Sequence, residues 1–180
     1  MRTVLSVVLF ALAAVTAPAG AVTELARAPK TPAPPAGYAL QPVGQGTLTW
    51  FGLHIYDAAL WAPNEAVDFE RPFALVLRYA RSLDGASVAA RSIEEIERLG
   101  AGSAAQRVAW GALLRSTVPD VEAGDQIAAV HRPGWGARFY LNGRLLAEIA
   151  DPAFSRAFFS IWLDPRTRVP ELRAALIGAH

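Results

Sequence analysis

The sequence predicts an α+β fold with a largely antiparallel sheet, and two observations support this prediction. Strand-like and helix-like segments occur in separate blocks, in the order strands, two helices, strands, two helices. An Asn142-Gly143 pair joins two short apolar segments, which is a strong local signal for an antiparallel hairpin. The chain has no cysteine, so its core must be held together by packing rather than by disulfides.

The N-terminus predicts a secretory signal peptide at residues 1–21. Arg2 precedes an apolar run from Val4 to Val15, and Ala19-Gly20-Ala21 has the small residues of a cleavage site. The run is too short to cross a bilayer, which takes about 20 residues. No later apolar run approaches that length, so we expect no transmembrane segment after cleavage. These features predict a periplasmic or secreted protein that begins near Val22.

Residues 22–40 predict a leader in front of a single domain at residues 41–180. Four prolines stand among alanines in this segment, which is typical of an extended tether. The remaining length suits one domain with its own core.

Charge and motif content exclude several classes of function. The chain has 17 basic and 16 acidic residues, and cleavage that removes Arg2 balances them, so net charge attracts neither nucleic acid nor an anionic membrane. His54, His131 and His180 are far apart in the sequence, so no metal site is expected. Dinucleotide and phosphate-loop fingerprints are absent from the sequence, and we expect no cofactor.

The first block predicts strands. Leu48–Tyr56 is rich in aromatic and β-branched residues and is expected to form one strand, with a second extended piece from Asp57 to Trp61. Phe73–Tyr79 is almost uninterruptedly apolar, which predicts a central strand buried on both faces.

Two helices follow. Asp84 is the expected N-cap of the first, which ends near Gly100, and Ser103 is the expected N-cap of the second, which ends near Thr117. A further strand is expected at Asp125–His131.

The last third predicts a hairpin and two helices. Arg138–Leu141 and Arg144–Ile149 are expected to pair around a type I′ turn, because Asn and Gly accept the positive φ values of that turn. Asp151-Pro152 is expected to start a helix that ends before Pro165, and Pro170–Ile177 a final short helix.

Three segments are informative in combination: Gly44–Ala58, Phe73–Tyr79, and Asp151–Phe154 leading to the Ile-Trp-Leu-Asp-Pro run that ends at Pro165. Together they resemble the chalcone isomerase-like family, and specifically its exported bacterial branch, over residues 41–178. The resemblance implies an open-faced antiparallel β-sandwich with helices packed on one face. It also implies a cleft between the sheet and the helices.

The resemblance further implies candidate site residues. In plant chalcone isomerases a strand arginine stabilises the developing negative charge, and related plant proteins hold a fatty-acid carboxylate with an arginine and a tyrosine. Thr47 stands nearest to the arginine of the enzymes and Tyr56 near their strand threonine, while residues 85–88 lack the catalytic tyrosine. No catalytic residue is therefore assigned.

The predicted ligand-binding residues are Arg78, Tyr56, Thr47 and Tyr79. Arg78 lies inside an apolar strand and could anchor a carboxylate, because its planar fork of donors suits that group. The alternative for Arg78 is a solvent-facing position or a structural ion pair. For the two tyrosines, the alternative is a buried position with one satisfied hydroxyl.

The combined prediction is an exported, non-catalytic binding domain for a small apolar or amphipathic ligand, such as a fatty acid. Two alternatives remain open. One is an isomerase or lyase that stabilises an enolate in the same cleft with different polar groups. The other is a structural partner in an envelope complex, with side chains filling the cleft.

Overall fold

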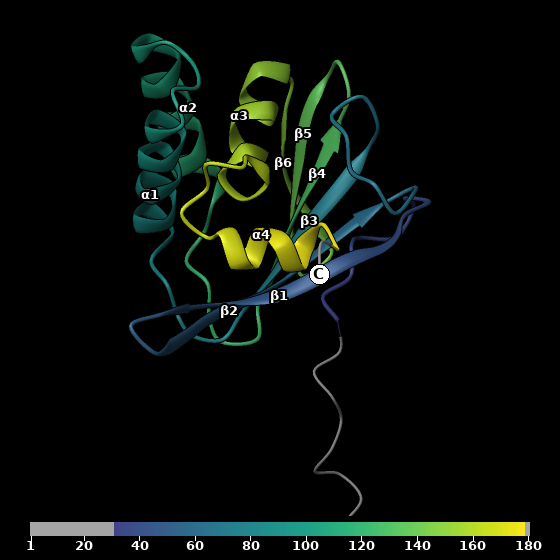
Figure 1. Cartoon of the computed structure of the whole chain (residues 1–180). Coiled ribbons are helices and arrows are strands. Elements are labelled where there is room, and N and C mark those ends of the chain that lie inside the picture. Colours follow the sequence, from purple (N-terminus) through teal and green to yellow (C-terminus); the bar gives the residue numbers. More distant parts are fainter. Residues whose placement is uncertain (1–30, 179–180) are drawn as a thin grey trace, which may run out of the picture. The chain divides into compact units, whose positions relative to one another are not determined.

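The computed structural model describes residues 31–178, which form a six-stranded antiparallel sheet and four helices (Figure 1). The strands, which pair in sequence order, are β1 (Gln41–Trp50), β2 (Leu53–Ala62), β3 (Phe73–Tyr79), β4 (Gln126–Arg132), β5 (Gly136–Leu141) and β6 (Arg144–Ile149). The helices are α1 (Gly85–Arg98), α2 (Ala104–Thr117), α3 (Pro152–Leu163) and α4 (Pro170–Leu176). The helices lie on one side of the open sheet, which confirms the predicted fold class.

The expected signal peptide at residues 1–21 lies outside the described residues, as do residues 22–30. Among the helices of the described part, none is long and apolar enough to cross a membrane.

Helix starts follow the local rules of the sequence. The side chain of Asp84 accepts a hydrogen bond from the Ser87 amide at the start of α1, and Asp151 accepts one from the Phe154 amide at the start of α3. Ser103 and Gln106 exchange bonds in a capping box at the start of α2. These caps confirm the predicted starts of three helices.

The hairpin β5–β6 also confirms its prediction. Leu141 pairs with Arg144 across a two-residue turn, in which Asn142 has φ 51° and Gly143 has φ 82°. Positive φ at both central positions is the backbone signature of a type I′ turn.

The prediction for the first strand was wrong in one respect. The expected strand Leu48–Tyr56 is interrupted by a turn at Phe51-Gly52, with φ values of 48° and 76°, so the chain reverses there and β1 pairs with β2. The sequence pattern did not reveal the turn because phenylalanine rarely occupies a left-handed position. β1 also begins earlier than expected, at Gln41.

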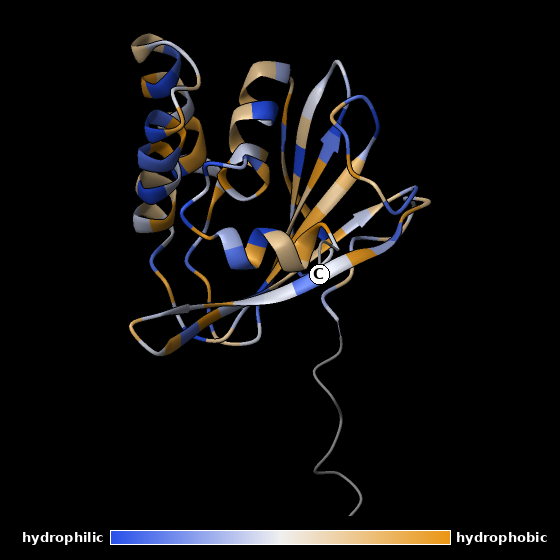
Figure 2. Cartoon of the chain, in the orientation of Figure 1, coloured by the Kyte–Doolittle hydropathy of each residue, from blue (hydrophilic) through white to orange (hydrophobic). Residues whose placement is uncertain are grey.

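The central strand β3 is buried on both faces, as predicted. Phe73, Leu75, Leu77 and Tyr79 point toward the helices and join the main core. Ala74, Val76 and Arg78 point to the opposite face, here called the outer face. Figure 2 shows the hydrophobic residues concentrated in the central strands, whereas α1 and α2 carry many hydrophilic residues.

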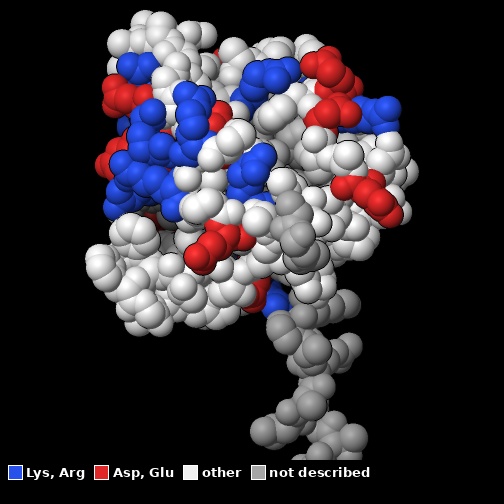
Figure 3. All heavy atoms as spheres, in the orientation of Figure 1, with Lys and Arg blue, Asp and Glu red and all other residues white. Residues whose placement is uncertain are grey.

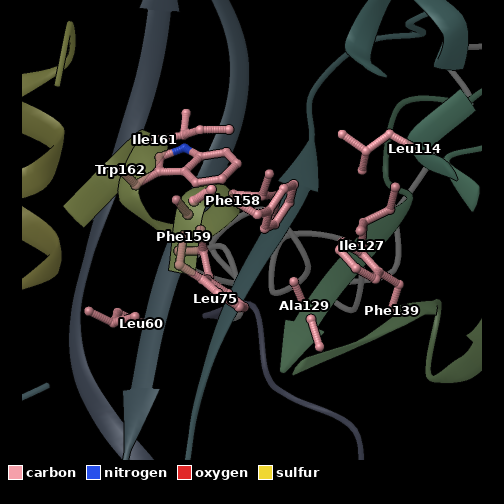
Figure 4. Packing of buried hydrophobic residues seen from close by; sticks show 14 of the residues in the cluster. Leu60, Leu75, Leu114, Ile127, Ala129, Phe139, Phe158, Phe159, Ile161 and Trp162 are labelled. Atoms are coloured by element: carbon pink, nitrogen blue, oxygen red, sulfur yellow. The ribbon is translucent and has the colours of Figure 1, made fainter. Parts of the chain in front are cut away.

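Contacts between helices and sheet are made mainly by α3 on β4 and β5 and by α4 on β1 and β2, while α1 packs on α2 and α3. Phe158, Phe159, Ile161 and Trp162 of α3 lie over the strands in the close view of the core (Figure 4). α4 lies directly on β1, where a Cβ added to Gly44 would come within 2.2 Å of the Ala175 carbonyl oxygen. Glycine therefore permits the close approach of α4.

Residues 31–40, the end of the segment predicted as a leader, contact the outer face. The indole N–H of Trp61 donates to the Pro32 carbonyl at 2.8 Å, and Gln126 Nε2 donates to the Ala33 carbonyl at 2.8 Å. The Tyr38 hydroxyl lies 2.9 Å from the Tyr140 hydroxyl. These bonds reach β2, β4 and β5, so this segment helps to cover the outer face.

Candidate functional site

Two of the predicted ligand residues, Tyr56 on β2 and Tyr79 on β3, lie together on the helix-facing side of the sheet. They are directly opposite one another in the strand pairing, and their rings meet edge to face with centroids 6.0 Å apart. The indole N–H of Trp162 on α3 donates to the Tyr56 hydroxyl at 3.0 Å. We call these three residues the tyrosine cluster.

The tyrosine cluster has hydroxyl groups available for a ligand. Tyr56 accepts a hydrogen bond from Trp162, so its own hydroxyl hydrogen remains free to donate. Within residues 31–178, the Tyr79 hydroxyl has no hydrogen-bond partner. The cluster therefore offers two donors on neighbouring strands.

Both phenols are held in their neutral form. Burial raises the pKa of Tyr56 to about 12, against the opposing effect of the bond from Trp162. Burial, followed by the effect of Tyr56, raises the pKa of Tyr79 well above its usual value. A neutral hydroxyl can donate to a carboxylate or a carbonyl oxygen, so the pair suits either group.

The core around the cluster keeps a small solvent exposure. Much of the core is sealed, with Leu60, Phe73 and Phe159 at 0% exposure. The residues that retain 7–9% exposure are mostly apolar side chains around the cluster: Tyr56, Leu77, Ile127, Phe158, Ile161 and Trp162. They come from β2, β3, β4 and α3, so the residual exposure of the core is shared by side chains of the sheet and of α3.

The other two predicted ligand residues, Thr47 and Arg78, lie on the outer face. Thr47 Oγ1 donates to Asp57 Oδ1 at 2.8 Å, and Arg78 Nη2 approaches Asp57 Oδ2 at 3.4 Å. His54 Nε2 lies 3.0 Å from the same carboxylate. The structure therefore does not bring the four predicted residues together, and one ligand between sheet and helices cannot contact them all.

Asp57 is the centre of this outer-face group. Partial burial works against its ionisation, but the bonds from Thr47, His54 and Arg78 together hold the pKa of the carboxyl below its usual value. Arg78 thus takes part in an ion pair, which was the alternative that the sequence left open for it.

A separate groove of about 450 Å³ lies between the α1–α2 loop and α3. Trp110, Ala153 and Ala157 contribute apolar surface, and Arg156 and Arg166 line it as well. Both arginines are engaged, Arg156 with Glu70 and Arg166 with Asp164. None of the four predicted ligand residues lines this groove.

Sequence reasoning missed Trp162 as the partner of Tyr56. The Ile-Trp-Leu-Asp-Pro run drew attention to this tryptophan, but only the packing of α3 on the sheet shows where its indole N–H points. In the part of the chain that the structure describes, no cluster of three or more histidine, aspartate or glutamate side chains could hold a metal ion.

Comparisons with known proteins agree with this architecture. A fatty-acid-binding protein of Arabidopsis thaliana has a similar fold, with a TM-score of 0.61 over 81% of this chain and 90% of that one, at 12% sequence identity. An uncharacterised protein of Haemophilus influenzae is 30% identical over 139 residues, which cover 77% of this chain and 68% of the relative. The family model described as chalcone isomerase-like matches residues 30–178, and the chain therefore belongs to the chalcone isomerase-like family.

Proposed function

We propose that this protein is an exported, non-catalytic binding domain for a small apolar or amphipathic ligand such as a fatty acid, held at the tyrosine cluster. The observation that carries the proposal is the pair of neutral tyrosine hydroxyls, with donor capacity unused, set among apolar side chains that keep a small exposed fraction. Binding of fatty acids by the Arabidopsis neighbour supports the same class of ligand.

The geometry suits an amphipathic ligand for two reasons. Aromatic and aliphatic side chains of α3 and the central strands surround the cluster, and each methylene that enters such a layer gains about 0.8 kcal/mol. The two phenols then supply donors for the polar end. Because they are neutral, they provide hydrogen bonds without the positive charge with which an arginine would stabilise an enolate.

The proposal is tested by comparing a saturated fatty acid with the alcohol of equal chain length in titration calorimetry. Tyr79→Phe removes one donor and should weaken the acid by about 13- to 160-fold, the equivalent of one hydrogen bond to a charged group. The matched control is Arg78→Met, which should leave the affinity for the acid unchanged because Arg78 pairs with Asp57 on the outer face.

Two outcomes would contradict the proposal, one for the position of the site and one for the class of ligand. A larger loss for Arg78→Met than for Tyr79→Phe would place the ligand on the outer face. No binding of either compound would contradict the class of ligand. Ligand identity is best sought by native mass spectrometry of protein taken from its own cells, followed by extraction of whatever is bound.

The remaining parts of the proposal have their own tests. For export, the intact mass of the released protein should match a chain that begins near Val22, and a mass matching residues 1–180 would contradict cleavage. For the absence of catalysis, a chalcone should cyclise no faster with the protein than in buffer. Turnover well above that background would favour the isomerase alternative.

A further inference from the structure

The turn between β1 and β2 exposes large apolar side chains that stability does not explain. We call Trp50, Phe51, Gly52 and Leu53 the hairpin tip. Phe51 is 91% exposed, Trp50 54% and Leu53 53%. The segment Leu48–Leu53 contains no charged residue, and Figure 3 shows the protruding lower-left end of the molecule as uncharged surface.

The backbone makes this arrangement costly. Phe51 has φ 48°, in a turn position that asparagine, aspartate and glycine occupy with less strain. A bulky residue there gains nothing by burial, since its main aromatic contact is the edge of Trp50, with ring centroids 5.2 Å apart. A strained, exposed aromatic residue is a reason to look for a function of the side chain itself.

We propose that the hairpin tip inserts into the interfacial layer of a lipid bilayer. The tip is a narrow, convex two-residue turn at the end of a ribbon, a shape that fits between lipid headgroups (Figure 1). Tryptophan and phenylalanine favour that layer, where an aromatic ring and a polar N–H are both accommodated.

Polar groups next to the tip fit the same partner. His54 follows the tip directly and is exposed. The Ala80 amide donates to the Ile55 carbonyl, and the exposed Arg81 follows Ala80 in the chain. The nearby Asp57 carboxylate is already bonded to Thr47, His54 and Arg78. Basic side chains beside an apolar tip would meet the phosphates of lipid headgroups.

The position of the tip gives the contact a consequence for the proposed ligand site. Tyr56 lies on β2, five residues after Phe51, and pairs with Leu48 across the same hairpin. A tip inserted in a bilayer would hold this end of the sheet near the source of an amphipathic ligand. The membrane contact itself requires no ligand, so its test is independent of the binding proposal.

The absence of cysteine in the chain allows a direct test. A polarity-sensitive dye is attached to Phe51→Cys or, as the matched control, to Val108→Cys, another exposed apolar position, on α2. Each labelled protein, purified as its cell produces it, is mixed with phosphatidylcholine vesicles, with and without phosphatidylglycerol. A blue shift of the dye at position 51 and none at position 108 is expected. No shift at position 51, or equal shifts at both positions, would overturn the proposal.

A second variant measures the contribution of Phe51 to binding. Phe51→Asn should lower partition into the same vesicles at least about 10-fold, because an aromatic side chain no longer leaves water. Its melting temperature should stay equal or rise, because asparagine tolerates the positive φ. Val108→Gln should bind as the unmodified protein does. If sedimentation shows dimers without vesicles and Phe51→Asn abolishes them, the tip joins two copies of the chain and the proposal is wrong.

Discussion

The indole N–H of Trp162 donates to the hydroxyl of Tyr56 at 3.0 Å, which joins α3 to β2 through two buried side chains. Removal of the acceptor leaves a buried donor without a partner. We expect Tyr56→Phe to lower the free energy of unfolding by about 1–3 kcal/mol, measured by urea denaturation.

The control for this bond is a double-mutant cycle with Trp162→Phe. Once the indole N–H is gone, the loss of the Tyr56 hydroxyl should cost less than it does in the unmodified protein. Equal costs in the two backgrounds would mean that the bond does not stabilise the fold.

His131 on β4 predicts how stability depends on pH. It is 3% exposed, its Nε2 lies 2.9 Å from the Phe69 carbonyl and its Nδ1 2.8 Å from the Ser155 hydroxyl. Since a carbonyl only accepts, Nε2 carries the proton and Ser155 donates to Nδ1. Burial lowers the pKa of His131 below the ordinary value of 6.5.

The lowered pKa of His131 decides whether stability rises or falls with pH. At a pH between the lowered pKa of His131 in the folded protein and its ordinary pKa of 6.5, the unfolded chain binds more protons than the folded chain. The neutral, buried His131 therefore contributes its full stability above pH 6.5. This contribution is lost as the pH falls below 6.5 and through the folded-state pKa. We expect His131→Gln to flatten this part of the profile in urea titrations from about pH 5 to 8.

The β5–β6 turn predicts a purely conformational effect. Gly143 has φ 82°, and a Cβ added there would meet no atom within 4 Å. Gly143→Val should therefore cost about 1–2 kcal/mol because of the backbone alone. Gly143→Asn should cost less, since asparagine tolerates this region. Equal melting temperatures for the two variants would contradict this explanation.

The contact of α4 with β1 predicts a steric effect. An added Cβ at Gly44 would lie 2.2 Å from the Ala175 carbonyl oxygen, so α4 would have to move. We expect Gly44→Ala to destabilise the fold by on the order of 1–3 kcal/mol. The control is Gly111→Ala in α2, where the nearest atoms are 3.4 Å away and helix propensity favours alanine by about 0.5–1 kcal/mol. Thermal unfolding of both variants compares the two effects.

Much of the fold could be predicted from local chemistry. Asp84, Ser103 and Asp151 accept bonds from amides a few residues along the chain, so their capping depends on short segments alone. The Asn142-Gly143 turn is local in the same way. Strand alternation alone also places Arg78 and Tyr79, adjacent in one strand, on opposite faces, and this rule separates two of the predicted ligand residues without a structure.

Tertiary structure decided what local chemistry leaves open. The turn at Phe51-Gly52 goes against the preference of phenylalanine, and the pairing of β1 with β2 imposes it. Pairing also places Thr47 opposite Asp57, and Tyr56 opposite Tyr79. The bond from Trp162 joins residues 106 positions apart. The sequence by itself thus determined the starts of three helices and the β5–β6 turn, because these depend on interactions within a few residues. The register of the strands and the packing of α3 determined which side chains meet, because those contacts form only when distant segments fold together.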